Sequence, residues 1–367
     1  MMTLGQGHVE SSQLARGTRV YASAPEDSRV KVGVSVRRFG PHGGMERVAL
    51  GFVRWLAAGG HTVEVWSNSY VEIGPTVRHR PLGAGGRGVM WRAKSLAAAV
   101  AAIPTEECDV FLHFERGARG GAYRAGSGCA AAQAVAEGPN LSWPLIRAID
   151  ERTCRAAAPL IVNSEMVRTE MIRHYTVSPE RIRLVRNGVD LARFKPGPKA
   201  EHPTMVFVGA NARRKGLKTA LRALQLVPEA RLEVVGDVRS VAKRWAARLG
   251  VADRVRFHGD LAAPEAIISR AHVMVLPTRY DASANACLEA MACGVPVVTT
   301  EHNGASELAP TPWLVLSDPM DANHCAEVLR RAMSDRTLPE ACRSIAQAHA
   351  ADHAYGELLD ALVGGEA

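Results

Sequence analysis

Two carboxylates, Asp281 and Glu289, lie eight positions apart just after the apolar run 273–276. Small residues follow Asp281 and lead into a stretch with helical spacing, which ends at Gly294 before a second apolar run. This order predicts a strand, a loop, a helix and a strand, with the loop at the carboxyl end of the first strand, where open α/β sheets bind ligands. The loop residues are Ala282, Ser283, Ala284 and Asn285.

The predicted helix entry after Asp281 suits an anion. The first N–H groups of a helix have no intrahelical partner, and the helix dipole favours negative charge there. Asp281 can accept hydrogen bonds from ligand hydroxyl groups, and Glu289, about two turns into the helix, can face the same crevice. A helix-capping Asp281 with a solvated Glu289 is the alternative, and for an isolated pair of carboxylates it is the better one.

Two further loops have the composition of phosphate sites. Arg214 and Lys215 follow an apolar run that ends in Gly209 and precede a stretch with helical spacing. Cations at a helix entry beside a strand end predict phosphate binding, with a solvated basic turn as the alternative. Nearer the start of the chain, Gly43 and Gly44 precede another predicted helix, where the backbone can approach a phosphate closely. An ordinary glycine turn is the alternative there.

Four segments in the same order resemble the retaining family-4 glycosyltransferases. Residues 281–289 resemble the E-x7-E signature of this family, with aspartate in the first acidic place, and residues 214–216 resemble its R-K-G. Residues 187–196 resemble the interdomain N-G-V-D-x-x-x-F-x-P, and residues 43–46 resemble the N-terminal G-G loop. Within the family, the runs 123–126, 174–180 and 279–281 are most similar to glycosyltransferases of lipopolysaccharide core assembly, notably the heptose glucosyltransferases.

The resemblance implies an α/β fold with GT-B architecture, in which two Rossmann-like domains with parallel sheets face a cleft. We expect a disordered extension over residues 1–28, an acceptor-binding domain over 29–195 and a nucleotide-sugar-binding domain over 196–350. Residues 351–367 would cross back to the first domain.

The resemblance also implies roles for individual residues. Arg214 and Lys215 would hold the diphosphate of a nucleotide sugar, Glu289 the ribose and Asp281 the sugar hydroxyls. His258 would lie near the nucleotide base. His113 would lie near the reacting sugar, with a packed core histidine as an equal alternative. Some relatives carry aspartates where this chain has Gly121 and Ser127, so its acceptor or base is expected to differ.

The expected reaction transfers a hexose, with retention, from a nucleotide-diphosphate sugar, UDP-linked in our prediction, to a glycolipid or polysaccharide of the cell envelope. The chain contains no D-x-D, so we expect neither a metal nor any other cofactor. In a front-face mechanism the leaving phosphate accepts the proton of the acceptor. An epimerase or phosphorylase on the same fold, and a catalytically inactive binding subunit, are the alternatives.

The charge of the chain is concentrated in its first half. Residues 29–195 carry 24 Lys and Arg against 14 Asp and Glu, whereas residues 196–367 carry 19 against 20. A basic half predicts contact with an anionic membrane surface, with an evenly spread basic surface as the alternative. Few aromatic residues interleave with these arginines, which argues against a nucleic-acid partner. Seven cysteines without a C-x-x-C pair, and no spanning apolar run, predict a reduced cytoplasmic protein.

Overall fold

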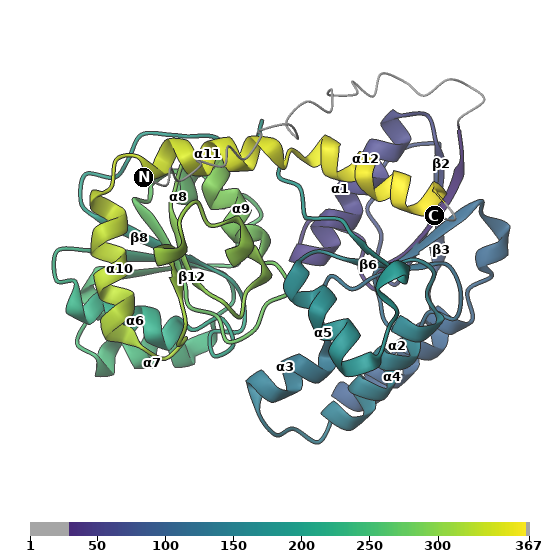
Figure 1. The fold of residues 1–367 in the computed structure, drawn as a ribbon, viewed down its shortest axis with the longest axis horizontal. Helices are drawn as coiled ribbons and strands as arrows, with labels where there is room; N and C mark the ends of the chain where they lie inside the picture. The colour runs from purple at the N-terminus through teal and green to yellow at the C-terminus, as the bar shows by residue number, and fades with distance from the viewer. Residues whose placement is uncertain (1–28, 365–367) are drawn as a thin grey trace, which may run out of the picture.

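The computed structural model describes residues 29–364, except for the side chains of residues 239 and 240. Within this range the chain forms two α/β units that lie side by side, with a long helical segment spanning both of them (Figure 1). This two-unit α/β architecture is the one that the sequence predicts. The expected disorder of residues 1–28 lies outside the described residues.

The first unit is built on a parallel sheet of seven strands in the order β3-β2-β1-β4-β5-β6-β7. The order changes direction at β1, which pairs with both β2 and β4. Loops at such a switch point splay apart and leave a crevice beyond the carboxyl ends of the strands. The strands are β1 (Lys31–Ser35), β2 (Thr62–Ser67), β3 (Val77–Pro81), β4 (Val110–His113), β5 (Ala122–Arg124), β6 (Leu160–Val162) and β7 (Ile182–Leu184).

The second unit repeats this plan with a parallel sheet of six strands in the order β10-β9-β8-β11-β12-β13. Its switch point lies between β8 and β11, so the loops after these two strands share one crevice. The strands are β8 (Thr204–Val208), β9 (Arg231–Val235), β10 (Val255–Gly259), β11 (Val273–Leu276), β12 (Val297–Thr300) and β13 (Val315–Leu316).

Helices connect the strands and cover both sheets (Figure 1). Those of the first unit are α1 (Gly44–Ala58), α2 (Val89–Ala101), α3 (Ala130–Glu137), α4 (Trp143–Ala156) and α5 (Glu165–Tyr175). Those that follow are α6 (Leu217–Leu226), α7 (Arg239–Arg248), α8 (Glu265–Arg270), α9 (Asn285–Ala292), α10 (Ala322–Ser334), α11 (Leu338–Ala348) and α12 (Ala351–Val363). Short 3₁₀ helices are η2 (Thr105–Glu107), η3 (Pro179–Arg181), η4 (Ala252–Arg254), η5 (Gly304–Leu308) and η6 (Pro312–Leu314).

Apolar runs make the central strands because both faces of a parallel sheet are covered by helices. Every residue of β11 is buried, and α1 turns Phe52 and Leu56 into the first core at helical spacing. The edge strand β3 is different, because only Val77 of its five residues is buried. The sequence pattern did not predict β3 or the three-residue β5, since neither is a continuous apolar run.

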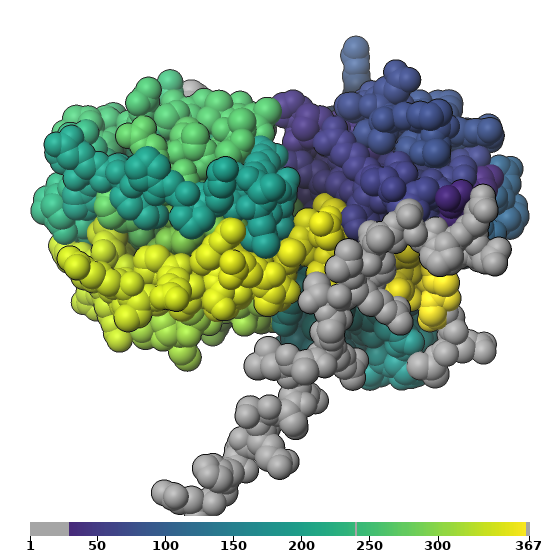
Figure 2. Space-filling model, turned by 90° about the horizontal axis from the view of Figure 1, so that it is seen from above, coloured from purple at the N-terminus to yellow at the C-terminus, as the bar shows by residue number. Residues whose placement is uncertain are grey.

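The C-terminal helix α12 belongs to the first core although it follows the second unit in sequence. Its Leu358 and Leu362 are buried in the same cluster as Phe52 and Leu56. Val189 of the linker and Ala350 form an isolated parallel bridge where the two crossing segments meet. Figure 2 shows the C-terminal segment, in yellow, running along the second unit and on to the first.

Candidate active site

A cleft of about 530 Å³ lies between the two units and is lined by loops from both. These loops follow the carboxyl ends of β1, β4, β5, β6 and β7 on one side and of β8, β9, β10 and β11 on the other. The two switch points therefore face one another across a single cavity, where a ligand would touch both units.

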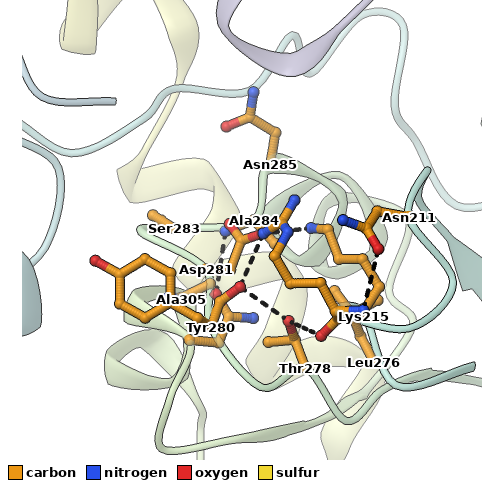
Figure 3. Close-up of polar contacts among 12 residues, drawn as sticks. Asn211, Lys215, Leu276, Thr278, Tyr280, Asp281, Ser283, Ala284, Asn285 and Ala305 are labelled. Carbon is orange, nitrogen blue, oxygen red and sulfur yellow. Dashed lines mark hydrogen bonds and ion pairs between the residues drawn. The ribbon is translucent and has the colours of Figure 1, made fainter. Parts of the chain in front are cut away.

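The cationic loop and the first carboxylate meet at the second-unit side of the cleft (Figure 3). Asp281 Oδ2 lies 2.9 Å from Arg214 Nη1 and 2.6 Å from Lys215 Nζ. Burial raises the pKa of Asp281, but the two cations outweigh it and hold the pKa below its usual value. Arg214 Nε also lies 3.7 Å from Glu137 Oε1 of α3, in the first unit. A phosphate group would compete with Asp281 for the donors of Arg214 and Lys215.

Backbone geometry fixes the position of these cations. Gly216 has φ +78°, and a Cβ atom there would lie 1.9 Å from the carbonyl oxygen of Pro277. The loop and the strand end after β11 are held together because the Arg214 carbonyl accepts hydrogen bonds from Arg279 N and Thr278 Oγ1. The tight approach at Gly216 and these two bonds bring the cations against Asp281.

The small-residue loop lies in the wall of the cleft, as predicted for Ala282, Ser283, Ala284 and Asn285. The Asn303 side-chain oxygen accepts from the N–H of Ala284, at 3.1 Å, and so shapes the entry to α9. Figure 3 shows Asn285 pointing away from the cationic cluster, and its amide donates to the Gly44 carbonyl of the first unit.

A residue that binds the ribose is expected to line the cleft, and Glu289 lies elsewhere. It is buried and forms a 2.8 Å ion pair with Arg47 of α1, and it is not among the residues that line the cleft. Burial raises the pKa of Glu289, and the Arg47 guanidinium opposes this rise. Its Oε2 atom has no hydrogen-bond partner among the described residues. The sequence analysis did not predict that Arg47 pairs with Glu289.

The glycine loops lie where the sequence places them. Gly43 precedes α1 with φ +95°, and Gly43, Gly44 and Gly209 all line the cleft. A Cβ atom at Gly43 would lie 2.2 Å from Glu46 Oε2, so this turn requires glycine on both conformational and steric grounds.

The two predicted site histidines lie outside the cleft lining. His113 is fully buried, stacks on Phe111 at 4.6 Å and shares a hydrogen bond with Ser35 through Nδ1. Burial lowers its pKa to about 4. Its burial away from the cleft lining favours the packed core histidine over a place near the reacting sugar. His258 pairs closely with Glu233 of β9 and does not reach the cavity, although Asp260 two positions later does.

The loop that carries Asp281 is also docked on the first unit. The Tyr280 hydroxyl donates to Glu170 Oε2 at 2.7 Å and accepts from Cys129 N at 2.8 Å. The Ser164 hydroxyl donates to the Ala282 carbonyl at 2.7 Å. No pattern in the sequence predicts these contacts, because each joins residues more than 100 positions apart.

Glu170 makes this docking dependent on pH. Burial raises the pKa of Glu170 to about 7 from its usual 4.5, and the Tyr280 hydrogen bond opposes the rise. Because the folded-state pKa is the higher one, the folded chain binds the extra proton, and its stability falls as pH rises towards and through 7. Between pH 5 and pH 8 we expect the melting temperature of Glu170→Gln to rise relative to that of the wild type.

Thermal unfolding of both proteins across this pH range measures the effect. Glu151→Gln, at a partly exposed glutamate of α4 in the same unit, is the matched control and should follow the wild type. Parallel pH profiles for the wild type and Glu170→Gln would contradict the assignment.

Two family models together cover most of the described chain. Residues 42–193 match the model described as Glycosyltransferase Family 4, and residues 189–349 match Glycosyl transferases group 1. The chain belongs to the GT-B glycosyltransferases. The family assignment agrees with the cleft, in which the Gly43 loop comes from the first matched segment and Arg214 and Asp281 come from the second.

Curated relatives of this glycosyltransferase include D-inositol 3-phosphate glycosyltransferases. That of Catenulispora acidiphila is 28% identical over 259 residues, which is 63% of this chain and 62% of the relative. That of Thermobifida fusca is 29% identical over 232 residues, covering 56% and 54%. The matches thus span little more than half the length of these relatives.

Solved structures show the same fold. WaaG, a glycosyltransferase involved in lipopolysaccharide biosynthesis, superposes with a TM-score of 0.77 at 21% identity, over 91% of this chain and all of the other. Sucrose-phosphate synthase from Thermosynechococcus elongatus gives 0.76 at 21%, over 90% and 98%. HepE of Anabaena, in complex with UDP-glucose, gives 0.71 at 17%, over 91% and 100%.

Proposed function

We propose that this protein is a retaining hexosyltransferase that uses a UDP-linked sugar and a glycolipid or polysaccharide acceptor of the cell envelope. The observation that carries the proposal is the cluster of Arg214 and Lys215 with Asp281, at a strand-to-helix turn facing the cleft. This cluster offers two charged donors to a diphosphate. The UDP-glucose complex of HepE, with the same fold, supports the choice of donor.

The chemistry follows from where the charges lie. As the bond between the anomeric carbon and the phosphate oxygen breaks, negative charge grows on the leaving phosphate, and Arg214 and Lys215 stabilise it. Fixed donors of this kind contribute roughly 2.7–4 kcal/mol each. The acceptor hydroxyl attacks from the same face, and its proton passes to the leaving phosphate. Asp281, released from the cations as the phosphate binds, is then available to the sugar hydroxyls.

Donor screening tests this function. The full chain is incubated with UDP-, GDP- and ADP-linked hexoses, with and without a phosphorylated lipid-core oligosaccharide, and the products are separated. Release of UDP with sugar found on the acceptor supports transfer. An altered sugar still linked to its nucleotide would indicate an epimerase, and sugar phosphate formed with inorganic phosphate would indicate a phosphorylase. No turnover with any donor would indicate a binding subunit.

Transfer is expected to proceed without a divalent ion. The diphosphate charge is met by Arg214 and Lys215, and the described residues contain no group of three or more His, Cys, Asp or Glu side chains arranged to hold a metal. Initial rates in EDTA should therefore stay within about twofold of those with Mg²⁺, since no step waits on metal binding. Abolition of transfer by EDTA, with recovery on adding Mg²⁺ or Mn²⁺, would contradict this expectation.

Binding to anionic vesicles tests the cell-envelope part of the proposal. The excess of cations in residues 29–195 suits a negatively charged lipid surface, where each basic residue contributes about 1 kcal/mol. Among the described residues no helix is long and apolar enough to cross a bilayer. Co-sedimentation should increase with the fraction of anionic lipid and disappear at high salt. Equal binding to neutral and anionic vesicles, or none to either, would instead favour an acceptor free in solution.

A further inference from the structure

Arg124, at the end of β5, is a buried cation in the first-unit wall of the cleft. Its side chain is 3% exposed, and its Nη2 atom donates to Asn187 Oδ1 at 2.9 Å and to the Val185 carbonyl at 3.3 Å. Its Nη1 atom has no partner among the described residues. Burial lowers the pKa of Arg124 to about 10, and the interaction with Tyr355 opposes this fall.

The other cations of the cleft each have a carboxylate. Arg38 pairs with Glu46, Arg47 with Glu289, and Arg214 with Asp281. Away from the cleft, the partly exposed Arg116 pairs with the buried Asp150 at 2.6 Å. Against this pattern, no ion pair is recorded for Arg124 in the described part of the chain. A buried charge without a counter-charge is destabilising, so its retention in a ligand cavity indicates a ligand that supplies one.

A second side chain with an unsatisfied polar atom comes from the strand next to β5. Asn163 follows β6, the strand between β5 and β7, and lines the same cavity with its side chain 2% exposed. Arg124 is in register with Ile161 of β6, and Asn163 follows the end of that strand. Asn163 Oδ1 has no hydrogen-bond partner among the described residues. Arg124 Nη1, a cationic donor, and Asn163 Oδ1, a neutral acceptor, thus belong to residues that line one cavity, and neither atom has a partner among the described residues.

We infer that Arg124 and Asn163 form a subsite for an oxyanion on the acceptor, a phosphate ester or a carboxylate, with Asn163 accepting from a neighbouring acceptor hydroxyl. This subsite rests on the proposed transferase function. Arg214 and Lys215 lie on the opposite, second-unit side, so the donor diphosphate and the acceptor anion would have separate cations. Ser127 also lines the cavity. Because a serine is uncharged, it does not compensate the charge of Arg124.

Calorimetric titration of inorganic phosphate, and separately of acetate, into the full chain saturated with UDP tests the inference. UDP occupies Arg214 and Lys215, so the remaining oxyanion site is observed alone. We expect the wild type to bind at least one of the two anions, and Arg124→Met to bind it about tenfold or more weakly, as the loss of a charged hydrogen bond predicts. The anion that binds distinguishes a phosphate ester from a carboxylate.

Arg54→Met, the same change at an exposed arginine of α1, is the matched control and should bind as the wild type does. Asn163→Asp provides a second variant, because a carboxylate at this position would compensate Arg124 and abolish oxyanion binding while leaving the arginine in place. If Arg124 only supports the linker through Asn187, Arg124→Met should lower the melting temperature and leave anion binding unchanged. That result would overturn the inference.

The wild type separates the two proposals. UDP binding together with donor turnover, but no binding of phosphate or acetate, would overturn the subsite and leave the transferase function standing. Failure to bind UDP or turn over any donor would remove the transferase function itself.

Discussion

Replacing Arg214 or Lys215 by alanine is expected to lower turnover about 10²–10³-fold in each case, with the fold intact. Both side chains lie within 3 Å of Asp281 Oδ2 in the cleft, and both are partly exposed, so their removal costs little packing. The loss should be larger in turnover than in donor affinity, because the charge on the leaving phosphate grows during the reaction.

Steady-state kinetics of the two single variants and the double variant measure this effect. The double variant should lose less than the product of the single losses, because both cations act on one diphosphate. Arg213→Ala is the control, since this exposed arginine lies in the same loop but does not line the cleft. Near-normal kinetics in a folded double variant would refute the assignment.

Gly216→Ala is expected to unfold or displace the cationic loop and to abolish donor binding. A non-glycine residue in the left-handed region costs about 1–3 kcal/mol by itself. In addition, the new Cβ atom would lie 1.9 Å from the Pro277 carbonyl oxygen, so either the loop or the end of β11 must move. Movement of either one separates Arg214 and Lys215 from Asp281.

Gly250→Ala separates the two causes. Gly250 has φ +65°, but a Cβ atom there would meet nothing within 4 Å, so this control carries the backbone cost without the clash. Chemical denaturation and UDP binding of both variants provide the comparison. If Gly216→Ala loses no more stability than Gly250→Ala and still binds UDP, the tight approach to Pro277 does not control the site.

The predictable part of the fold came from apolar runs and glycines. A short apolar run such as 273–276, bounded by turn residues, predicts a buried strand. Gly43 and Gly216 mark turns that other residues adopt poorly, so the loops of the cleft were predictable. The resemblance assigned Asp281, Arg214 and Lys215 to one site, and the structure shows why they meet: they follow the neighbouring parallel strands β8 and β11, whose carboxyl ends lie at one edge.

The sequence could not show the contacts that form where the two units approach each other. Arg47 and Glu289 are 242 positions apart, and nothing in their local context indicates an ion pair. The burial of His113 was equally hidden, because a histidine at a strand end reads the same whether it faces a cavity or the core. Arg124 lies in the run 123–126, which resembles a family segment. Only the structure shows that no carboxylate among the described residues pairs with it.

The docking of Tyr280 and Ala282 on the first unit limits how such chains can exchange domains. Asp281 lies between these two residues, so its backbone is held on both sides by contacts with Cys129, Ser164 and Glu170. A hybrid that grafts residues 196–350 onto a foreign first unit would retain every residue of the cationic cluster and still lose the anchor points of its carboxylate. A hybrid with a different first unit, made to change the acceptor, must therefore keep the contacts of Cys129, Ser164 and Glu170, although these residues do not line the cleft.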